Sequence, residues 1–146
     1  MSGQPGPARR LQSAVVVDDE EELAAVLEAN RAFYDAFEAH DMDRMSDAWE
    51  HRDEVTCTHP GWGVLRGWGP VAGSWYALFT NGQHLQFIVT AEQVVLAGDV
   101  AWVTCDENLL GDGRGADGTV AALNVFRRRD GRWRLVAHHG SAVHQR

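Results

Sequence analysis

Hydrophobic residues recur with a helical period in the first half of the chain. Between residues 23 and 37 they fall every three or four positions, which predicts an amphipathic helix beginning near Asp19 with an acidic first turn. Asp41 is placed to cap a second, short helix whose apolar side is Met42, Met45 and Trp49. A third helix is expected from Pro70, because proline suits a first helical turn.

Strand patterns dominate the second half. Residues 55–59 alternate with a period of two, and four longer runs of β-branched and aromatic residues follow at 84–95, 100–110, 120–128 and 133–143. Turn residues separate the longer runs, which indicates hairpins. The order of helix, helix, strand, helix and four strands predicts an α+β fold in which a curved antiparallel sheet wraps around three N-terminal helices.

The length of 146 residues fits a single domain. The Gly-, Pro- and Arg-rich start predicts a flexible tail over residues 1–17, which leaves residues 18–146 as the domain. No apolar run approaches the ~20 residues that span a bilayer. No signal peptide is recognisable either, so a cytoplasmic location is expected.

Charge and composition exclude several classes of function. The net charge is −8 and there is no basic stripe, which argues against nucleic acid or a membrane as partner. All thirteen basic residues are Arg, so Schiff-base chemistry on a lysine is excluded. Cys57 and Cys105 are expected to be buried and unbridged. The usual zinc spacings are absent, and we expect no metal and no cofactor.

A Gly- and Trp-rich stretch at residues 57–79 holds the first candidate site residue. His59 ends the first strand, and Pro60 keeps it extended. The loop and helix that follow contain Trp62, Trp68 and Trp75. A histidine beside three tryptophans is typical of a pocket mouth. The alternative is a tight loop pinned to the core by its aromatic side chains.

Three motifs resemble the nuclear-transport-factor-2-like superfamily, and within it the SnoaL-like proteins. They are His-Pro-Gly at 59–61, Gly-Asp-Val-Ala-Trp-Val at 98–103, and the closing Asp-Gly-Arg-Trp and His-His-Gly-Ser at 130–133 and 138–141. The resemblance covers about residues 20–144. It implies a cone-shaped, cystatin-like α+β roll with a cavity, a fold that hosts isomerases, cyclases, hydrolases, dehydratases and association domains.

Ketosteroid isomerases are the first branch that the chain resembles. The resemblance places His59 where those enzymes have a general-base Asp before Pro. It places Asn124 at their second acid and Tyr34 close to their oxyanion Tyr. A neutral histidine can accept a proton, and Asn and Tyr can donate to a developing oxyanion. The base differs from the Asp of that branch.

The association domain of calcium/calmodulin-dependent kinase II is the second branch. Its last strand carries Trp followed by His-x-His-x-Ser. Here Trp133 is followed by Ala137, His139 and Ser141, so the first histidine of that motif is replaced. The resemblance implies that this ending also suits an assembly module.

Side-chain alternation sorts the remaining candidates. If Asn124 faces the cavity, Phe126 does as well, and the isomerase-like pattern turns His138 inward. On the strand at 100–110 we take Asp106 to face inward together with Trp102, Thr104 and Asn108. Asp106 would then orient His59 or His138, as a carboxylate orients a base in a triad. The alternative is that Asp106 is a polar residue at the rim, near a hairpin.

The first functional hypothesis is an enzyme or binding protein for a small hydrophobic molecule with a carbonyl or hydroxyl group. The reaction class is proton transfer, as in ketosteroid isomerase-like isomerisation, polyketide cyclase-like cyclisation or dehydration. His59 is the candidate base, and Tyr34 and Asn124 are the candidate oxyanion donors, with Asp106 as an orienting group. The substrate-binding candidates are Trp62, Trp68, Trp75, Phe126 and His138.

The second hypothesis is a non-catalytic association or ligand-sensing module. The strands are apolar on both faces, and the helices suffice to cover only one. We therefore expect a homodimer through the outer face of the sheet, where His139 and Ser141 would lie. A third alternative is a metal site of His59, His138 and Asp106, although no pair of these ligands has a diagnostic spacing.

Overall fold

Three helices form where the helical periodicity predicts them. The structure, a computed structural model, describes residues 8–10, 19–81, 85–110 and 118–144. The helices are α1 (Asp19–Ala39), α2 (Met42–Ala48) and α3 (Trp68–Thr80). Asp41 caps α2 as predicted, and α3 begins two residues before Pro70, after Gly67 with a φ of 90°. Among the described residues, no helix combines the length and the apolar composition needed to cross a membrane.

The described strands form one mixed sheet. They are β1 (Ala8–Arg10), β2 (Thr56–Thr58), β3 (Leu65–Arg66), β4 (Gln86–Ala97), β5 (Val100–Leu110), β6 (Gly118–Arg129) and β7 (Arg132–Ala142). Their order across the sheet is β1-β4-β5-β6-β7-β2-β3. Strands β4 to β7 pair antiparallel, whereas β1 joins β4 and β2 joins β7 in parallel.

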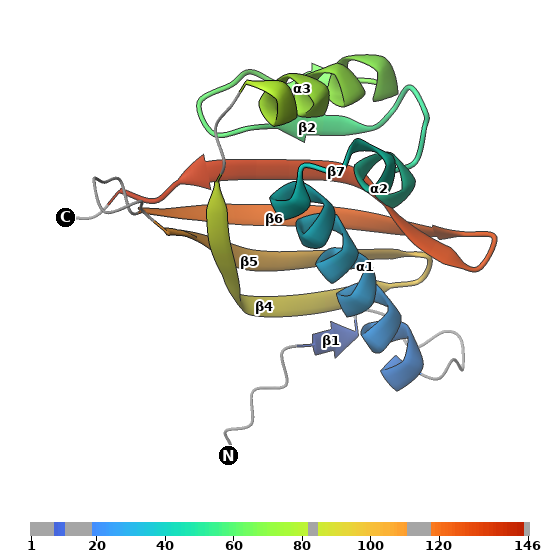
Figure 1. Cartoon of the computed structure of the whole chain (residues 1–146). Helices are drawn as coiled ribbons and strands as arrows, with labels where there is room; N and C mark the ends of the chain where they lie inside the picture. The colour runs from blue at the N-terminus through green and yellow to red at the C-terminus, as the bar shows by residue number, and fades with distance from the viewer. Residues whose placement is uncertain (1–7, 11–18, 82–84, 111–117, 145–146) are drawn as a thin grey trace.

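The predicted α+β class is confirmed, with two short strands that no sequence pattern indicated. Strand β3 has two residues and pairs with β2. Strand β1 falls within the predicted tail, and the rest of that tail lies outside the described residues. Figure 1 shows α1 and α2 lying across one face of the sheet, with α3 beside β2.

The sheet bends around α1 because β4 and β7 each carry an extra, unpaired residue. The register between β4 and β5 shifts between Thr90 and Gln93, where Ala91 has a φ of 60°, and β4 turns sharply in Figure 1. A second shift, between Val125 and Phe126, interrupts the pairing of β6 with β7. Such bulges bend a strand and increase its twist. The result is a concave face that receives the helices.

The core fills the space between the helices and this concave face. Its largest fully buried side chains are Trp49, Trp75, Phe33, Phe126, Met45 and Leu135. Burying a large apolar side chain contributes about 2–3 kcal/mol relative to leaving it in water. These contacts hold α1, α2 and α3 to the sheet and make the frame in which the polar residues of the interior are fixed.

Strand β7 runs beside the turn that follows β2. Cys57 of β2 lies opposite His138 of β7 in the parallel pairing. Gly140 leaves little space there, because a Cβ at that position would lie 3.5 Å from the Pro60 ring. This close approach brings the end of β2, and with it His59, next to the inward side chain of His138.

Candidate functional site

A hydrogen-bonded set of buried polar side chains lies between α1 and the concave face of the sheet. Nδ1 of His138 is 2.6 Å from Oδ1 of Asn124. The amide nitrogen of Asn124 donates to Oδ1 of Asn30 at 2.9 Å and to the hydroxyl of Tyr34 at 3.1 Å. All four side chains are buried. Two residues singled out from the sequence, Tyr34 and Asn124, are therefore in direct contact.

Two carboxyl groups end this set. The hydroxyl of Tyr34 donates to Oε2 of Glu107 at 2.7 Å, and Nδ2 of Asn30 donates to Oε2 of Glu92 at 2.7 Å. Sγ of Cys105 lies 3.4 Å from the Tyr34 hydroxyl. We refer to the whole set as the buried polar chain, which consists of His138, Asn124, Asn30, Tyr34, Glu107 and Glu92.

The hydrogen bonds of the buried polar chain all donate in the same direction, from His138 toward the two carboxylates. The amide nitrogen of Asn124 is used as a donor, so its oxygen must accept from His138. His138 is therefore protonated at Nδ1, and its Nε2 carries a lone pair. The Tyr34 hydroxyl accepts a hydrogen bond from Asn124 and donates one to Glu107. The chain runs from an imidazole that donates to carboxylates that accept.

Burial controls which members of the chain are charged. It raises the pKa of Glu107 to about 7, and the hydrogen bond from Tyr34 offsets only part of this rise. Burial, and then the negative charge of Glu107, raises the pKa of Tyr34 well above its usual range. Burial lowers the pKa of His138 to about 3, with smaller contributions from His59 and His139. At neutral pH His138 is uncharged, while Glu107 populates both protonation states.

His59 lies at the end of β2 and is buried rather than placed at a rim. Its Nε2 is 2.9 Å from Oγ of Ser74, and that hydroxyl donates to the carbonyl of Val71. Ser74 therefore accepts from His59, which leaves Nδ1 of His59 with the lone pair. Burial lowers the pKa of His59 to about 4, so the ring is neutral at pH 7. Sγ of Cys57 is 3.7 Å from Nε2.

The two buried histidines share an aromatic neighbour. The ring centroids of His59 and His138 are 6.5 Å apart, and Trp75 lies 4.7 Å from the first and 5.9 Å from the second. The indole nitrogen of Trp75 is buried without a hydrogen-bond partner in the described part of the chain. No group of three His, Cys, Asp or Glu side chains in the described part of the chain is arranged to hold a metal ion.

The inward placement of Asp106 is wrong. Asp106 lines a shallow depression on the outer face of the sheet, together with Leu123, His139 and Ser141. The side chains of β5 that face the helices are Val103, Cys105 and Glu107, all buried, whereas Trp102, Thr104 and Asn108 share the outer face with Asp106. The small residues fit under α1, and the large indole of Trp102 lies on the outer side. Asp106 is therefore on the opposite face from Asn124 and His138.

The remaining aromatic candidates have different surroundings. Trp75 and Phe126 are fully buried core residues. Trp62 is 43% exposed and meets the His59 ring edge-on at 4.8 Å. Trp68 stacks on His51 at 4.4 Å, on the α2 side of the core. Trp62 and Trp75 are thus the two tryptophans that the structure brings to His59.

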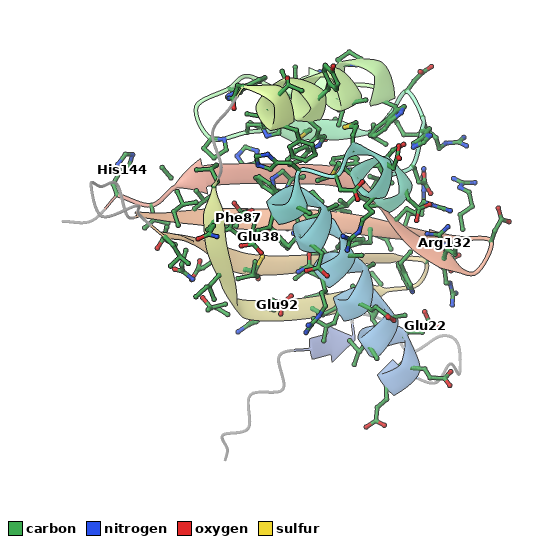
Figure 2. The ribbon with its side chains drawn as sticks, viewed as in Figure 1. Glu22, Glu38, Phe87, Glu92, Arg132 and His144 are labelled. Carbon is green, nitrogen blue, oxygen red and sulfur yellow. The ribbon has the colours of Figure 1, made fainter. Side chains whose placement is uncertain are left out.

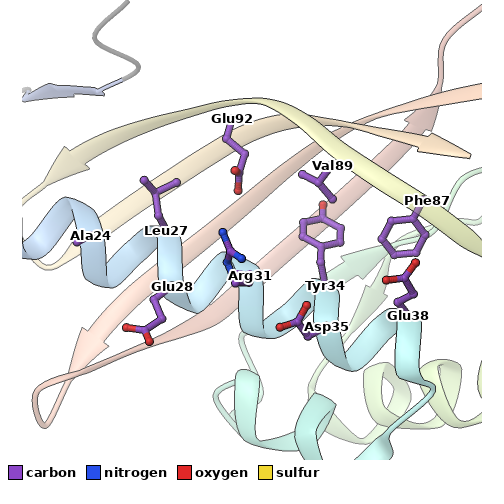
Figure 3. Close-up of a pocket in the computed structure, with 10 residues that line it drawn as sticks. All are labelled: Ala24, Leu27, Glu28, Arg31, Tyr34, Asp35, Glu38, Phe87, Val89 and Glu92. Atoms are coloured by element: carbon purple, nitrogen blue, oxygen red, sulfur yellow. The ribbon is translucent and has the colours of Figure 1, made fainter.

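A groove of about 650 Å³ opens between α1 and β4. It is lined by Ala24, Leu27, Glu28, Arg31, Tyr34, Asp35, Glu38, Phe87, Val89 and Glu92 (Figure 3). Figures 2 and 3 show Glu38 close to Phe87, and in Figure 3 Tyr34 points from α1 toward β4. We call this cavity the α1–β4 groove. Tyr34 and Glu92 belong to both the α1–β4 groove and the buried polar chain. The buried polar chain therefore reaches solvent through the groove.

The groove carries more negative than positive groups. Four of its lining side chains are carboxylates, at Glu28, Asp35, Glu38 and Glu92, and Arg31 is its one guanidinium. Figure 3 shows Arg31 and Glu92 pointing toward one another across the groove. Leu27, Phe87 and Val89 supply apolar wall, so the groove suits an uncharged apolar molecule better than an anion.

The sequence did not single out Glu107, Glu92 or Asn30 as site residues. A signal for Glu107 exists, because the alternation of Ala101, Val103 and Cys105 continues to it with a period of two. Glu92 had no such signal, since it lies in the register shift that bends β4.

A bent mixed sheet with helices on its concave face and a polar set buried beneath α1 defines a nuclear-transport-factor-2-like domain. Sequence comparison agrees with this class. Residues 26–145 match the family model of the SnoaL-like domain, and the chain belongs to that family.

Solved structures of similar proteins match almost the whole fold. A protein from Streptomyces avermitilis, described as a candidate dehydratase of the NTF2-like family, is 38% identical with a TM-score of 0.80 and covers 87% of this chain and 99% of its own. A candidate calcium/calmodulin-dependent protein kinase type II association domain from Thiobacillus denitrificans is 34% identical with a TM-score of 0.73, over 80% of this chain and 93% of its own.

A match among curated proteins is F-box protein SKIP8 of Arabidopsis thaliana. It is 30% identical over 119 residues, which are 82% of this chain. The chain spans 50% of the length of that relative.

Proposed function

We propose that this chain binds an uncharged hydrophobic molecule with a carbonyl or hydroxyl oxygen in the α1–β4 groove and moves a proton on it. The observation that carries the proposal is Tyr34, which lines the groove and whose hydroxyl is hydrogen-bonded to Glu107 and Asn124. A fixed hydroxyl donor beside an apolar wall suits a ligand oxygen on which negative charge develops. Isomerisation, cyclisation and dehydration all fit this chemistry.

The residues take distinct roles in this proposal. Tyr34 donates to the ligand oxygen. Asn124 acts through Tyr34, because its amide nitrogen already donates to Tyr34 and Asn30. His59 is the proposed proton acceptor, through the lone pair on Nδ1. It does not line the groove, so the part of the ligand that loses the proton has to extend from the groove to the end of β2. Its pKa of about 4 makes it a weak base at pH 7, so its substrate must be acidified by the hydrogen bond from Tyr34.

Two observations on relatives support an enzyme. The Streptomyces avermitilis protein, which is 38% identical, is described as a candidate dehydratase, and dehydration also needs a proton acceptor and a polarised oxygen. The chain also belongs to the SnoaL-like family. We therefore propose proton transfer as the reaction class of this chain. We also propose that the reaction needs no cofactor.

Binding and proton transfer to 2-acetylnaphthalene test the proposal. The compound should quench tryptophan fluorescence, and its methyl hydrogens should exchange with deuterium faster with the protein than without it. Tyr34→Phe removes the donor and should weaken binding about ten-fold and slow the exchange. Tyr76→Phe, a change at a tyrosine that is 61% exposed, is the control. Equal affinities and equal exchange rates in wild type and both variants would show that Tyr34 is not the donor to the ligand oxygen.

An association module is the second candidate function. The structure from Thiobacillus denitrificans, 34% identical, is described as a candidate association domain, which supports an assembly role for this chain. In that case the partner is a second copy of the chain, and the outer face is where it binds. The cytoplasmic location inferred from the sequence is a prediction in both cases.

A further inference from the structure

We propose that Glu107 decides whether Tyr34 can donate a hydrogen bond to a ligand, so that a ligand with an acceptor oxygen binds only when Glu107 carries a proton. This inference rests on the proposed function, because it concerns the same groove and the same hydroxyl. It makes Glu107 a positioning residue, which acts on the ligand through Tyr34.

Counting hydrogens at Tyr34 gives the first step. The hydroxyl has one hydrogen and two lone pairs. The amide nitrogen of Asn124, at 3.1 Å, can only donate to it. An ionised Glu107, with Oε2 at 2.7 Å, can only accept from it. The single hydrogen of Tyr34 is then committed to Glu107, and none is left for an acceptor oxygen in the groove.

Protonation of Glu107 reverses the direction of this bond. The carboxyl O–H donates to Tyr34, which accepts from both Glu107 and Asn124 with its two lone pairs. The hydrogen of Tyr34 is released and can turn toward the groove that Tyr34 lines (Figure 3), where a ligand oxygen is a stronger acceptor than Sγ of Cys105 at 3.4 Å. At a pH where Glu107 of the free protein is ionised, binding of one ligand is therefore coupled to the uptake of one proton from solvent by Glu107.

The surroundings of Glu107 make both protonation states accessible. It is 5% exposed, and its hydrogen bond comes from Tyr34. The titratable groups that face it are Tyr34 from α1, Cys57 from β2 and Cys105 from its own strand, with Glu92 of β4 acting on Cys105. None of these is a cation. Burial therefore holds the pKa of Glu107 at about 7, within the range where cells and assays operate.

Two matched probes test the inference in the full chain. The first is 2-acetylnaphthalene, which has only an acceptor oxygen, and the second is 2-ethylnaphthalene, which has none. Affinity is measured by tryptophan fluorescence from pH 5.5 to 8.5, and proton uptake by calorimetry in two buffers of different ionisation enthalpy. The ketone should lose affinity about ten-fold for each pH unit above about 7, with close to one proton taken up. The hydrocarbon should show neither effect.

Variants separate the positioning role from a structural one. In Glu107→Gln the amide cannot titrate, so ketone affinity should be the same at every pH from 5.5 to 8.5. Tyr34→Phe should erase the preference for the ketone over the hydrocarbon. If Glu107→Gln does not fold, the pH profile and the proton count of the wild type still decide.

The outcomes distinguish the two proposals. If both probes bind but the affinity for the ketone does not vary from pH 5.5 to 8.5, the role of Glu107 is overturned. The same holds if the ketone binds without proton uptake. In both cases the groove remains the proposed ligand site. Failure of both probes to bind at any pH overturns the groove as the ligand site, and the role of Glu107 with it.

Discussion

Nδ1 of His138 lies 2.6 Å from Oδ1 of Asn124, and both side chains are buried. Asn124 cannot turn its amide around without losing its hydrogen bonds to Asn30 and Tyr34. Its oxygen is therefore fixed toward His138, which must hold its proton on Nδ1. An uncharged amide thus sets the tautomer of a histidine, a task that a carboxylate performs in many triads.

The tautomer of His138 is the first prediction. Long-range ¹H–¹⁵N NMR correlations of the imidazoles should show His138 protonated at Nδ1 throughout the neutral range. Asn124→Asp keeps the shape but adds a negative charge, which should raise the pKa of His138 by at least one unit from its value of about 3. Asn124→Leu, which removes the acceptor, is the comparison. Protonation of wild-type His138 at Nε2 would contradict the assignment.

The second prediction concerns stability and pH at Glu107. The folded pKa of about 7 lies above the ordinary glutamate pKa of 4.5, so the unfolded chain releases this proton more easily. Glu107 therefore costs stability as the pH rises from about 4.5 through 7, by on the order of 3 kcal/mol at completion. Glu107→Gln should gain stability relative to wild type at pH 8 but not at pH 4.5.

Urea unfolding of both proteins at several pH values measures this difference. Comparing variant with wild type at each pH cancels the titration of His59 and His138, which lower stability as the pH falls below 6.5. Glu28→Gln, a change at an exposed groove residue, is the control. A difference between Glu107→Gln and wild type that does not vary with pH would show that Glu107 titrates normally.

The long elements were predictable because each carries many periodic positions. The apolar face of residues 23–37 fixes α1, and the β-branched runs fix β4 to β7 within a few residues. Strand β3 was not predictable, since two residues hold no period and its pairing with β2 depends on the fold. The bulges in β4 and β7 likewise depend on tertiary packing rather than on a local sequence pattern.

The candidate site was predictable only in part. The sequence indicated Tyr34, Asn124 and His138, and these lie in one hydrogen-bonded set. The facing of β5 was misjudged, because Asp106 was taken to face inward together with Trp102, whereas Val103 and Cys105 are the buried side chains on the α1 side. With the facing inverted, Asp106 was chosen in place of its neighbour Glu107. Because side chains alternate between the two faces of a strand, an error of one residue in the alternation assigns every side chain to the wrong face.

The third prediction is a homodimer through the outer face of the sheet. This face exposes Ile88 and Leu123, at 53% and 40%, and no helix in the described residues covers it. Sedimentation velocity at micromolar concentration should show a dimer, and Leu123→Arg should convert it to a monomer by placing a charge in an apolar contact. Tyr76→Arg, on the far side of α3, should remain dimeric. A wild-type monomer would refute the interface.

The last prediction separates the catalytic and structural roles of His59. The sequence suggested that His59 lies at a pocket mouth. The structure buries His59 to 4% exposure and bonds it to Ser74, so His59→Ala should lower the free energy of unfolding by about 1–3 kcal/mol whatever its chemical role. Alanine alone is therefore a poor test of catalysis.

A pair of variants makes the distinction. His59→Gln keeps an N–H group that can donate to Ser74 but has no basic nitrogen, so it should retain most stability and slow deuterium exchange into bound 2-acetylnaphthalene by ~10²–10⁴-fold. Ser74→Ala removes the same hydrogen bond and leaves the imidazole, so it should cost about 1 kcal/mol and slow exchange far less. Thermal melts and NMR exchange rates measure both quantities. Equal exchange rates in His59→Gln and wild type would mean that His59 only supports the end of β2, and that the proton acceptor is another residue.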